Sequence, residues 1–249
     1  MIGRPLLVMA LLLVAASSVA ADQPAVADTL ATDHGPLLVH PFGHASLALV
    51  WQKTEIMVDP VGGAQRYSGL PRPHLILVTH RHGDHFDADT VRDLAGEHTV
   101  VVTPQDVAES IPANDAVTLA HGESIAAHGV VVAAVPAYNR TDGRLEFHPR
   151  GRDNGYVVDF DGFRVYISGD TEDVPELAEL GEVDAAFLCM NLPWTMSPAQ
   201  AVRAARTIGP RVLYPYHFRN GDGTMTDLEE LRRELADDET IEVRVLDWY

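Results

Sequence analysis

Cysteine is almost absent from this chain of 249 residues, which contains only Cys189. An intramolecular disulfide needs two cysteines, so none can form. Cys189 lies in the apolar run of residues 185–190, where a buried and inert thiol is the simplest interpretation. A chain of this length can bury a full core without covalent support.

Basic residues are also scarce, since 18 Lys and Arg stand against 36 Asp and Glu, a formal net charge of −18. Lys53 is the only lysine. Nucleic acids and anionic membrane surfaces are bound through clusters of basic residues, so we expect neither as a partner. A small-molecule substrate is the expected partner, and the sequence leaves the oligomeric state open.

Long hydrophobic runs are missing except near the start, where residues 6–16 are apolar. Arg4 precedes this run and small residues follow it at positions 18–21, a pattern typical of a cleaved signal peptide. The run is too short for a permanent transmembrane helix, and no cysteine follows it to accept a lipid. We therefore expect a periplasmic or secreted protein without a stable membrane anchor.

The remaining sequence predicts one domain. We assign residues 1–21 to the signal peptide, 22–35 to a flexible segment rich in Pro, Ala and Asp, and 36–249 to the domain. Short Val-rich runs bounded by turn residues predict many strands and few helices, and hence an α/β fold with two sheets covered by helices. The strands are expected at 37–40, 46–51, 55–59, 75–79, 99–103, 116–119, 130–136, 155–160, 163–168, 185–190, 212–216 and 241–246, and the helices at 88–95, 104–110, 174–180, 198–208 and 227–235.

The strongest chemical signal follows the predicted strand at 75–79. His80, His82, Asp84 and His85 lie within six residues. Imidazole and carboxylate groups are ligands of Zn²⁺, and this alternation can direct two pairs of ligands toward two neighbouring metal positions. A single histidine here would be an ordinary polar loop residue, but four ligand types at the end of one strand favour a metal site.

This His-x-His-x-Asp-His loop resembles the signature of the metallo-β-lactamase superfamily. The resemblance continues in segments before and after the loop: 43–46, 58–60, 135–139, 147–149, 169–171 and 214–217. Their order is similar to that of the branch that includes ascorbate-6-phosphate lactonase and, more distantly, N-acyl-phosphatidylethanolamine phospholipase D. The resemblance implies a four-layer αββα sandwich with a metal site at one edge.

The resemblance also implies a ligand set. It assigns His80 and His82 to one metal, Asp84, His85 and His217 to a second metal, and Asp170 to a bridging position. Asp170 and His217 each follow a predicted strand, as ligands at a sheet edge would.

One position departs from the pattern. Many relatives place a third histidine for the first metal where this chain has Asn139. His148, nine residues later, could replace the missing ligand. Alternatively, Asn139 could leave the first metal weakly held, so that the site works with one metal. The sequence leaves both alternatives open.

Three further features have less specific patterns. His44 resembles a family position near the metals, although a hydrogen-bonded structural histidine fits equally well. Asp59 is expected to orient a ligand histidine, because metal-bound imidazoles usually donate their other N–H to an acceptor. The segment 191–196 either lines a pocket or simply connects two elements.

The expected activity is hydrolysis. One or two divalent cations, Zn²⁺ first and Mn²⁺ or Fe as alternatives, would lower the pKa of a bound water to about 7 and polarise the substrate. Asp84 would steer the water and transfer its proton to the leaving group. The sequence therefore predicts a metal-dependent hydrolase that acts on an ester, lactone or phosphodiester bond.

Other functions remain open at this point. A β-lactamase is one, although the best-known two-metal class carries cysteine where this chain has Asp170. Oxidative chemistry at a single iron also occurs in the superfamily. A non-catalytic metal-binding or sensing protein is the alternative of a different kind, and Asn139 is the residue that suggests it.

Overall fold

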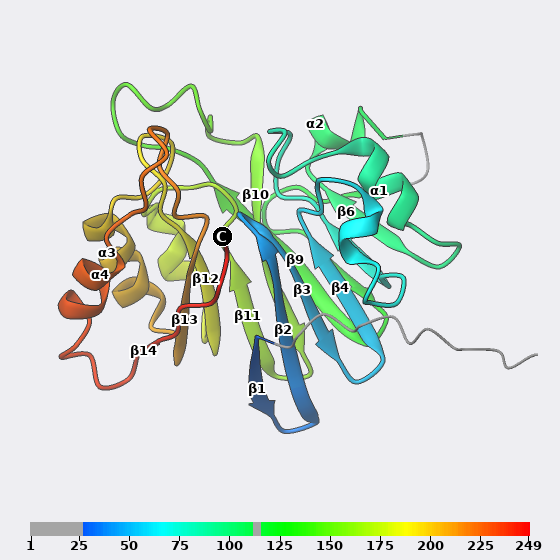
Figure 1. Cartoon of the computed structure of the whole chain (residues 1–249), viewed down its shortest axis with the longest axis horizontal. Helices are drawn as coiled ribbons and strands as arrows, with labels where there is room; N and C mark the ends of the chain where they lie inside the picture. Colours follow the sequence, from blue (N-terminus) through cyan, green and yellow to red (C-terminus); the bar gives the residue numbers. More distant parts are fainter. Residues whose placement is uncertain (1–26, 112–115) are drawn as a thin grey trace, which may run out of the picture.

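The computed structural model describes residues 27–111 and 116–249 (Figure 1). The predicted signal peptide lies outside these residues. The described residues form two seven-stranded sheets. Figure 1 shows α1 and α2 on the outer side of one sheet and α3 and α4 on the outer side of the other.

The first sheet takes its strands in chain order, antiparallel from β1 to β4 and parallel from β4 to β7. Met57 and Ile76 point outward from it and pack with Val91 and Leu94 of α1. The elements of this half are β1 (Asp28–Thr32), β2 (Gly35–Gly43), β3 (Ser46–Trp51), β4 (Thr54–Val58), the 3-10 helix η1 (Ala64–Tyr67), β5 (Leu75–Leu77), α1 (Ala88–Leu94), β6 (Val100–Thr103), α2 (Gln105–Ala108) and β7 (Ala116–Thr118).

The second sheet has the order β14-β13-β12-β11-β10-β9-β8, antiparallel from β8 to β11 and parallel from β11 to β14. Helix α3 begins with a capping box formed by Ser197 and Gln200, with Pro198 in its first turn. The elements of this half are β8 (Ser124–Ala127), β9 (Val130–Ala137), β10 (Asp153–Phe160), β11 (Phe163–Ile167), the 3-10 helix η2 (Pro175–Glu179), β12 (Ala185–Cys189), α3 (Pro198–Ile208), β13 (Val212–Tyr216), α4 (Leu228–Glu234) and β14 (Glu242–Val243).

The main core lies between the two sheets. Leu49 and Ile56 from the first sheet share one fully buried cluster with Val132, Val158 and Tyr166 from the second. Side chains alternate across each strand, so one face of each sheet meets the other sheet and the opposite face meets helices. The predicted four-layer αββα sandwich, the metallo-β-lactamase fold, is confirmed.

The flexible segment predicted at 22–35 is wrong for its last part, because Asp28–Thr32 form β1 and pair with β2. Leu30 is the inward residue of this strand and is buried. The Asp28 carboxylate accepts hydrogen bonds from the Tyr214 hydroxyl at 2.7 Å and from Arg244 at 3.1 Å. The polar composition of the segment does not indicate a strand, because the hydrogen-bond partners that hold it lie far away in the chain.

Three further elements differ from the expectation. The predicted strand at 241–246 shortens to β14, and the predicted helix at 174–180 is the 3-10 helix η2. Strand β8 was not predicted, because its outward residues are small and exposed and form no apolar run.

Several strands end at the same edge of the sandwich. The loops after β5, β9, β11 and β13 carry His80, Asn139, Asp170 and His217 respectively. Parallel strands bring their carboxyl ends to one edge, which explains why residues so distant in sequence meet there. Across residues 27–111 and 116–249, no helix has the length and apolarity that crossing a bilayer requires.

Candidate metal centre

The ligand loop is anchored by Asp59, directly after β4. Its Oδ1 accepts the backbone N–H of Thr79 at 2.7 Å, and its Oδ2 accepts the Thr79 hydroxyl at 2.7 Å. The Nδ1 of His85 also lies 2.7 Å from Oδ2. This arrangement fixes the His85 ring with Nδ1 as donor and leaves the Nε2 lone pair facing the site.

The Thr79 hydroxyl orients His80 in the same way. Because this hydroxyl donates to Asp59, its oxygen accepts from Nδ1 of His80 at 2.9 Å. The Nε2 lone pair of His80 is therefore free for a metal. Asp59 was expected to orient one ligand histidine, and it orients two of the predicted ligands, one directly and one through Thr79.

Three histidines converge at the predicted first metal position. The Nδ1 of His82 lies 3.1 Å from Nε2 of His80 and 3.2 Å from Nε2 of His148. Two nitrogen ligands about 2.1 Å from a tetrahedral Zn²⁺ stand roughly 3.4 Å apart, so these separations match neighbouring ligand positions. All three nitrogens fall in one compact group.

Asp170 lies between the two predicted positions. Its Oδ2 is 3.4 Å from Nε2 of His148, whereas its Oδ1 is 3.4 Å from Nε2 of His85 and 3.5 Å from Nε2 of His217. Asp84 reaches the second side, with Oδ2 3.5 Å from Nε2 of His217. The structure thus brings together all seven residues predicted from the sequence.

Two buried atoms that lack hydrogen-bond partners within the described part of the chain indicate that a cation can bind between these residues. Nε2 of His85 and Oδ1 of Asp170 have no hydrogen-bond partner among the described residues. Buried polar atoms are rarely left without a partner, and a cation bound by both atoms would satisfy them. The donor set of imidazoles and carboxylates suits Zn²⁺, so the residues present fit a metal.

The electrostatics favour neutral histidines. Burial lowers the pKa of His80, His82 and His217 below the usual value, and it lowers the pKa of His148 to about 4. These imidazoles therefore offer lone pairs at neutral pH. Burial would also lower the pKa of His85, but the carboxylates of Asp170 and Asp59 raise it to about 10. The carboxylates that stabilise a proton on Nε2 of His85 would equally stabilise a metal ion there.

Residues 39–217 match the family model described as the beta-lactamase superfamily domain. The chain is also 31% identical over 208 residues to the UPF0173 metal-dependent hydrolase of Thermococcus onnurineus, covering 78% of this chain and 90% of that relative. This chain belongs to the UPF0173 metal-dependent hydrolase family. The sequence had indicated the superfamily and the enzyme class.

Solved structures agree with this family assignment. A putative metal-dependent hydrolase from Parabacteroides distasonis is 39% identical, with a TM-score of 0.81 over 89% of this chain and 98% of that one. Igni18, a metallo hydrolase from Ignicoccus hospitalis, has a TM-score of 0.71 at 21% identity, covering 85% of this chain and 95% of that one. The second similarity concerns the fold alone.

Asn139, the residue that departs from the superfamily pattern, forms hydrogen bonds that hold the loop after it. Its Nδ2 donates to the backbone oxygens of Arg144 at 3.1 Å and Trp194 at 2.6 Å. Its backbone N–H donates to the oxygen of His148 at 2.8 Å. These bonds close the loop so that His148, and not Asn139, points its side chain toward His82.

Glu172 holds the same loop from the other side, and no sequence pattern pointed to this role. Its fully buried Oε2 accepts the backbone N–H groups of Arg140 and Thr141 and the Thr141 hydroxyl, each at 2.8 Å. Glu172 lies two residues after Asp170, so one short segment positions both the Asp170 carboxylate and the loop that carries His148.

His44 contacts the second position from the loop between β2 and β3. Its Nε2 lies 3.1 Å from Oδ2 of Asp84, and its ring centre is 3.9 Å from that of His217. The hydroxyl of Tyr249 is 3.3 Å from Nδ1 of His44. The sequence left the role of His44 open, and no spacing pattern pointed to Tyr249.

The segment 191–196 reaches the predicted second metal position at His217. Asn191 is buried, and its Nδ2 lies 3.3 Å from Nε2 of His217. Of the two interpretations that the sequence allowed, the structure therefore favours a loop that lines the site.

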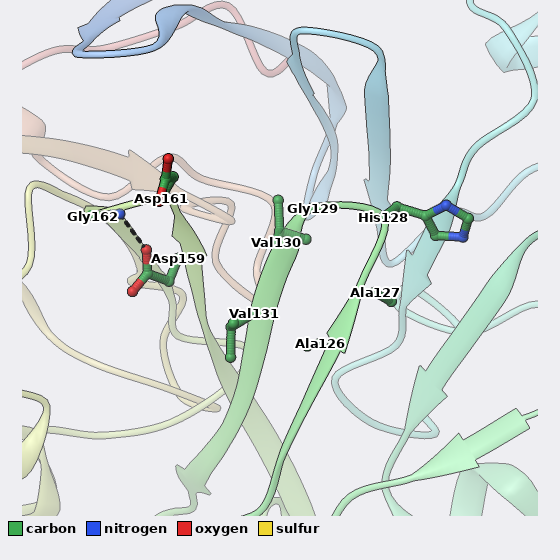
Figure 2. Close-up of a pocket in the computed structure, with 9 residues that line it drawn as sticks. All are labelled: Ala126, Ala127, His128, Gly129, Val130, Val131, Asp159, Asp161 and Gly162. Carbon is green, nitrogen blue, oxygen red and sulfur yellow. Dashed lines mark hydrogen bonds between the residues drawn. The ribbon is translucent and has the colours of Figure 1, made fainter.

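A separate pocket of about 420 Å³ lies where β8, β9, β10 and β11 turn, at the opposite ends of these strands from the ligand loops (Figure 2). Two tight turns line it, at His128-Gly129 and Asp161-Gly162, and Asp159 accepts the N–H of Gly162. Among the residues that the structure describes, His128 is the only histidine that lines this pocket, so it offers a control position away from the predicted metal centre.

Proposed function

We propose that this protein is a two-metal hydrolase, with zinc as the metal, that cleaves an ester, lactone or phosphodiester bond in a small molecule. The observation that carries the proposal is the position of Asp170. Its two oxygens face separate groups of histidines, each at 3.4 Å. One carboxylate placed in this way is suited to bridge two cations.

The proposed ligands follow from the same geometry. His80, His82 and His148 would hold the first metal, and Asp84, His85 and His217 the second. Because Nε2 of His148 lies 3.2 Å from Nδ1 of His82, while Nδ2 of Asn139 donates to backbone oxygens, we assign the third ligand of the first metal to His148. This assignment favours two metals over the one-metal alternative.

The bound cations would supply an activated water and polarise the substrate oxygen. Asp84 is the residue suited to move the proton. Burial would raise its pKa, but the hydrogen bond from His44 and the nearby His85 lower it, so Asp84 is a carboxylate at neutral pH. Its side chain is 46% exposed, which lets Oδ2 accept a proton from water and pass it to a leaving group.

Two finer proposals depend on the sequence. The order of the segments that resemble the superfamily supports a substrate like that of the lactonase-like branch, a sugar-derived lactone or ester. The pattern at residues 4–21 supports export with cleavage after Ala21. N-terminal sequencing of protein recovered from the periplasm or medium tests the second proposal, and an uncleaved product found only inside the cell would contradict it.

Elemental analysis tests the metal assignment. We expect about two zinc ions per chain in the wild-type protein and about one in His148→Ala. His128→Asn is the matched control, because asparagine tolerates the left-handed backbone at this position and should keep both metals. A His148→Ala protein with full metal content would contradict the ligand assignment.

Turnover tests the reaction. A panel of esters, lactones, phosphodiesters and β-lactams should reveal hydrolysis by the wild-type protein and almost none by Asp84→Asn or His82→Ala with preserved folding. Hydrolysis of β-lactams alone would favour a β-lactamase. Bound zinc without turnover of any compound would favour a binding or sensing protein.

A further inference from the structure

A buried amide lies beside the second metal position. Asn191 lies two residues after the end of β12 and is 1% exposed. Its Nδ2 is 3.3 Å from Nε2 of His217, the atom assigned above to a metal. The amide therefore lies within one hydrogen bond of the proposed reaction centre.

Thr195 determines which way this amide points. The backbone N–H of Asn191 donates to the Thr195 hydroxyl oxygen at 2.9 Å, so that hydroxyl directs its own hydrogen elsewhere. Oδ1 of Asn191 accepts it at 2.5 Å. A flipped amide would instead donate from Nδ2 to the hydroxyl oxygen, and the hydroxyl hydrogen would be left with the backbone oxygen of Asn191 at 3.5 Å, which is a weaker arrangement. Nδ2 is consequently the atom that faces the metal position.

Nδ2 of Asn191 loses its acceptor once His217 binds a metal. A metal-bound imidazole nitrogen uses its lone pair for the metal, so Nε2 of His217 can then no longer accept a hydrogen bond. Within residues 27–111 and 116–249, Nδ2 of Asn191 has no other hydrogen-bond partner. A buried donor without an acceptor is unfavourable, and an oxygen atom of a substrate would remove this penalty.

Three hydrogen bonds hold the turn that carries the amide. The N–H of Leu192 donates to Oδ1 of Asn220 at 2.9 Å, and the oxygen of Leu192 accepts the N–H of Gly221 at 2.9 Å. Asn139 donates to the oxygen of Trp194. A donor that is fixed before the reaction stabilises developing charge without reorganisation.

We propose that Asn191 is a catalytic residue that donates a hydrogen bond from Nδ2 to the substrate oxygen on which negative charge develops. This proposal rests on the proposed hydrolase function. In ester hydrolysis, the oxygen of water forms a bond to the carbonyl carbon, and the bond from that carbon to the leaving group then breaks. One proton of the water passes to the leaving-group oxygen. Between these events the former carbonyl oxygen is negatively charged, and Asn191 stabilises it.

Inorganic phosphate, a small tetrahedral oxyanion, is the probe for this donor. Calorimetric titration of the zinc-loaded protein with phosphate should give a dissociation constant about 10- to 100-fold weaker for Asn191→Ala than for the wild type, at equal zinc content. Thr195→Val, which frees the amide to flip, should also weaken binding. Thr195→Ser keeps the hydroxyl and should bind phosphate like the wild type.

Three results would overturn the proposal: equal phosphate affinity in Asn191→Ala and the wild type, no phosphate binding by the zinc-loaded wild type, or loss of zinc in Asn191→Ala. The last result would make Asn191 a structural support of His217. Failure of the proposed hydrolase function would be visible separately, as full zinc content without turnover of any compound in the panel.

Discussion

Replacing Glu55 by glutamine should change the pH dependence of stability. Glu55 lies in β4, two residues before Met57. Side chains alternate along a strand, so Glu55 lies on the same face as Met57, the face that packs against α1, and it is 2% exposed. Neither of its carboxylate oxygens has a hydrogen-bond partner among the described residues. Burial raises the pKa of Glu55 from 4.5 to about 7. The folded protein therefore retains this proton over a pH range in which the unfolded chain releases it.

The sign and the size follow from this pKa. Stability associated with protonated Glu55 is fully present below pH 4.5 and is lost as the pH rises through about 7. The shift corresponds to roughly 3 kcal/mol between the two protonation states, of which about 2 kcal/mol falls between pH 5 and pH 8. Glutamine does not ionise, so the free energy of unfolding of Glu55→Gln should not fall in this way as the pH rises.

Urea unfolding between about pH 5 and pH 8 provides the assay. The free energy of unfolding of Glu55→Gln, relative to the wild type, should rise by about 2 kcal/mol across this interval. Glu109→Gln changes an exposed glutamate and is the matched control, which should show no such trend. Parallel pH profiles for Glu55→Gln and the wild type would refute the reasoning.

Three further predictions concern the metal centre and its support. Asp59→Asn weakens the acceptor that orients two ligand histidines, so zinc affinity measured by chelator competition should fall about 10- to 100-fold, and an unchanged affinity would contradict this role. Glu172→Ala should release the loop of residues 140–148 and leave about one zinc per chain by elemental analysis, whereas two would show that other contacts suffice. Gly169→Ala places a Cβ 2.9 Å from the oxygen of Asn154 at a φ of +58°, so the free energy of unfolding should fall by about 2–3 kcal/mol in a denaturant titration. Gly209→Ala has a similar φ but open space around its Cβ, and it should lose only about 1 kcal/mol; equal losses would exclude the clash as the cause.

The sequence predicted those parts of the site that local patterns encode. His80, His82, Asp84 and His85 lie close together in the chain, and Asp170 and His217 each follow a strand, so their convergence follows from how strands end at a sheet edge.

The remaining parts depend on contacts that no local pattern records. His148 reaches the site only because Asn139 and Glu172 close the loop between them. Tyr249 meets His44 across 205 residues. Strand β1 was missed for the same reason, because Tyr214 and Arg244 from the second half of the chain hold its first residue.

The ligand sets combine both halves of the molecule. His80 and His82 come from the first half and His148 from the second, and the other position likewise combines Asp84 and His85 with His217. Each bound ion would therefore act as a cross-link between segments far apart in the chain. An ion that binds only when the two segments are brought together in the folded protein adds its binding free energy to folding. In a protein with a single cysteine, metal ions would thus take the place of disulfides as reversible cross-links between the two sheets.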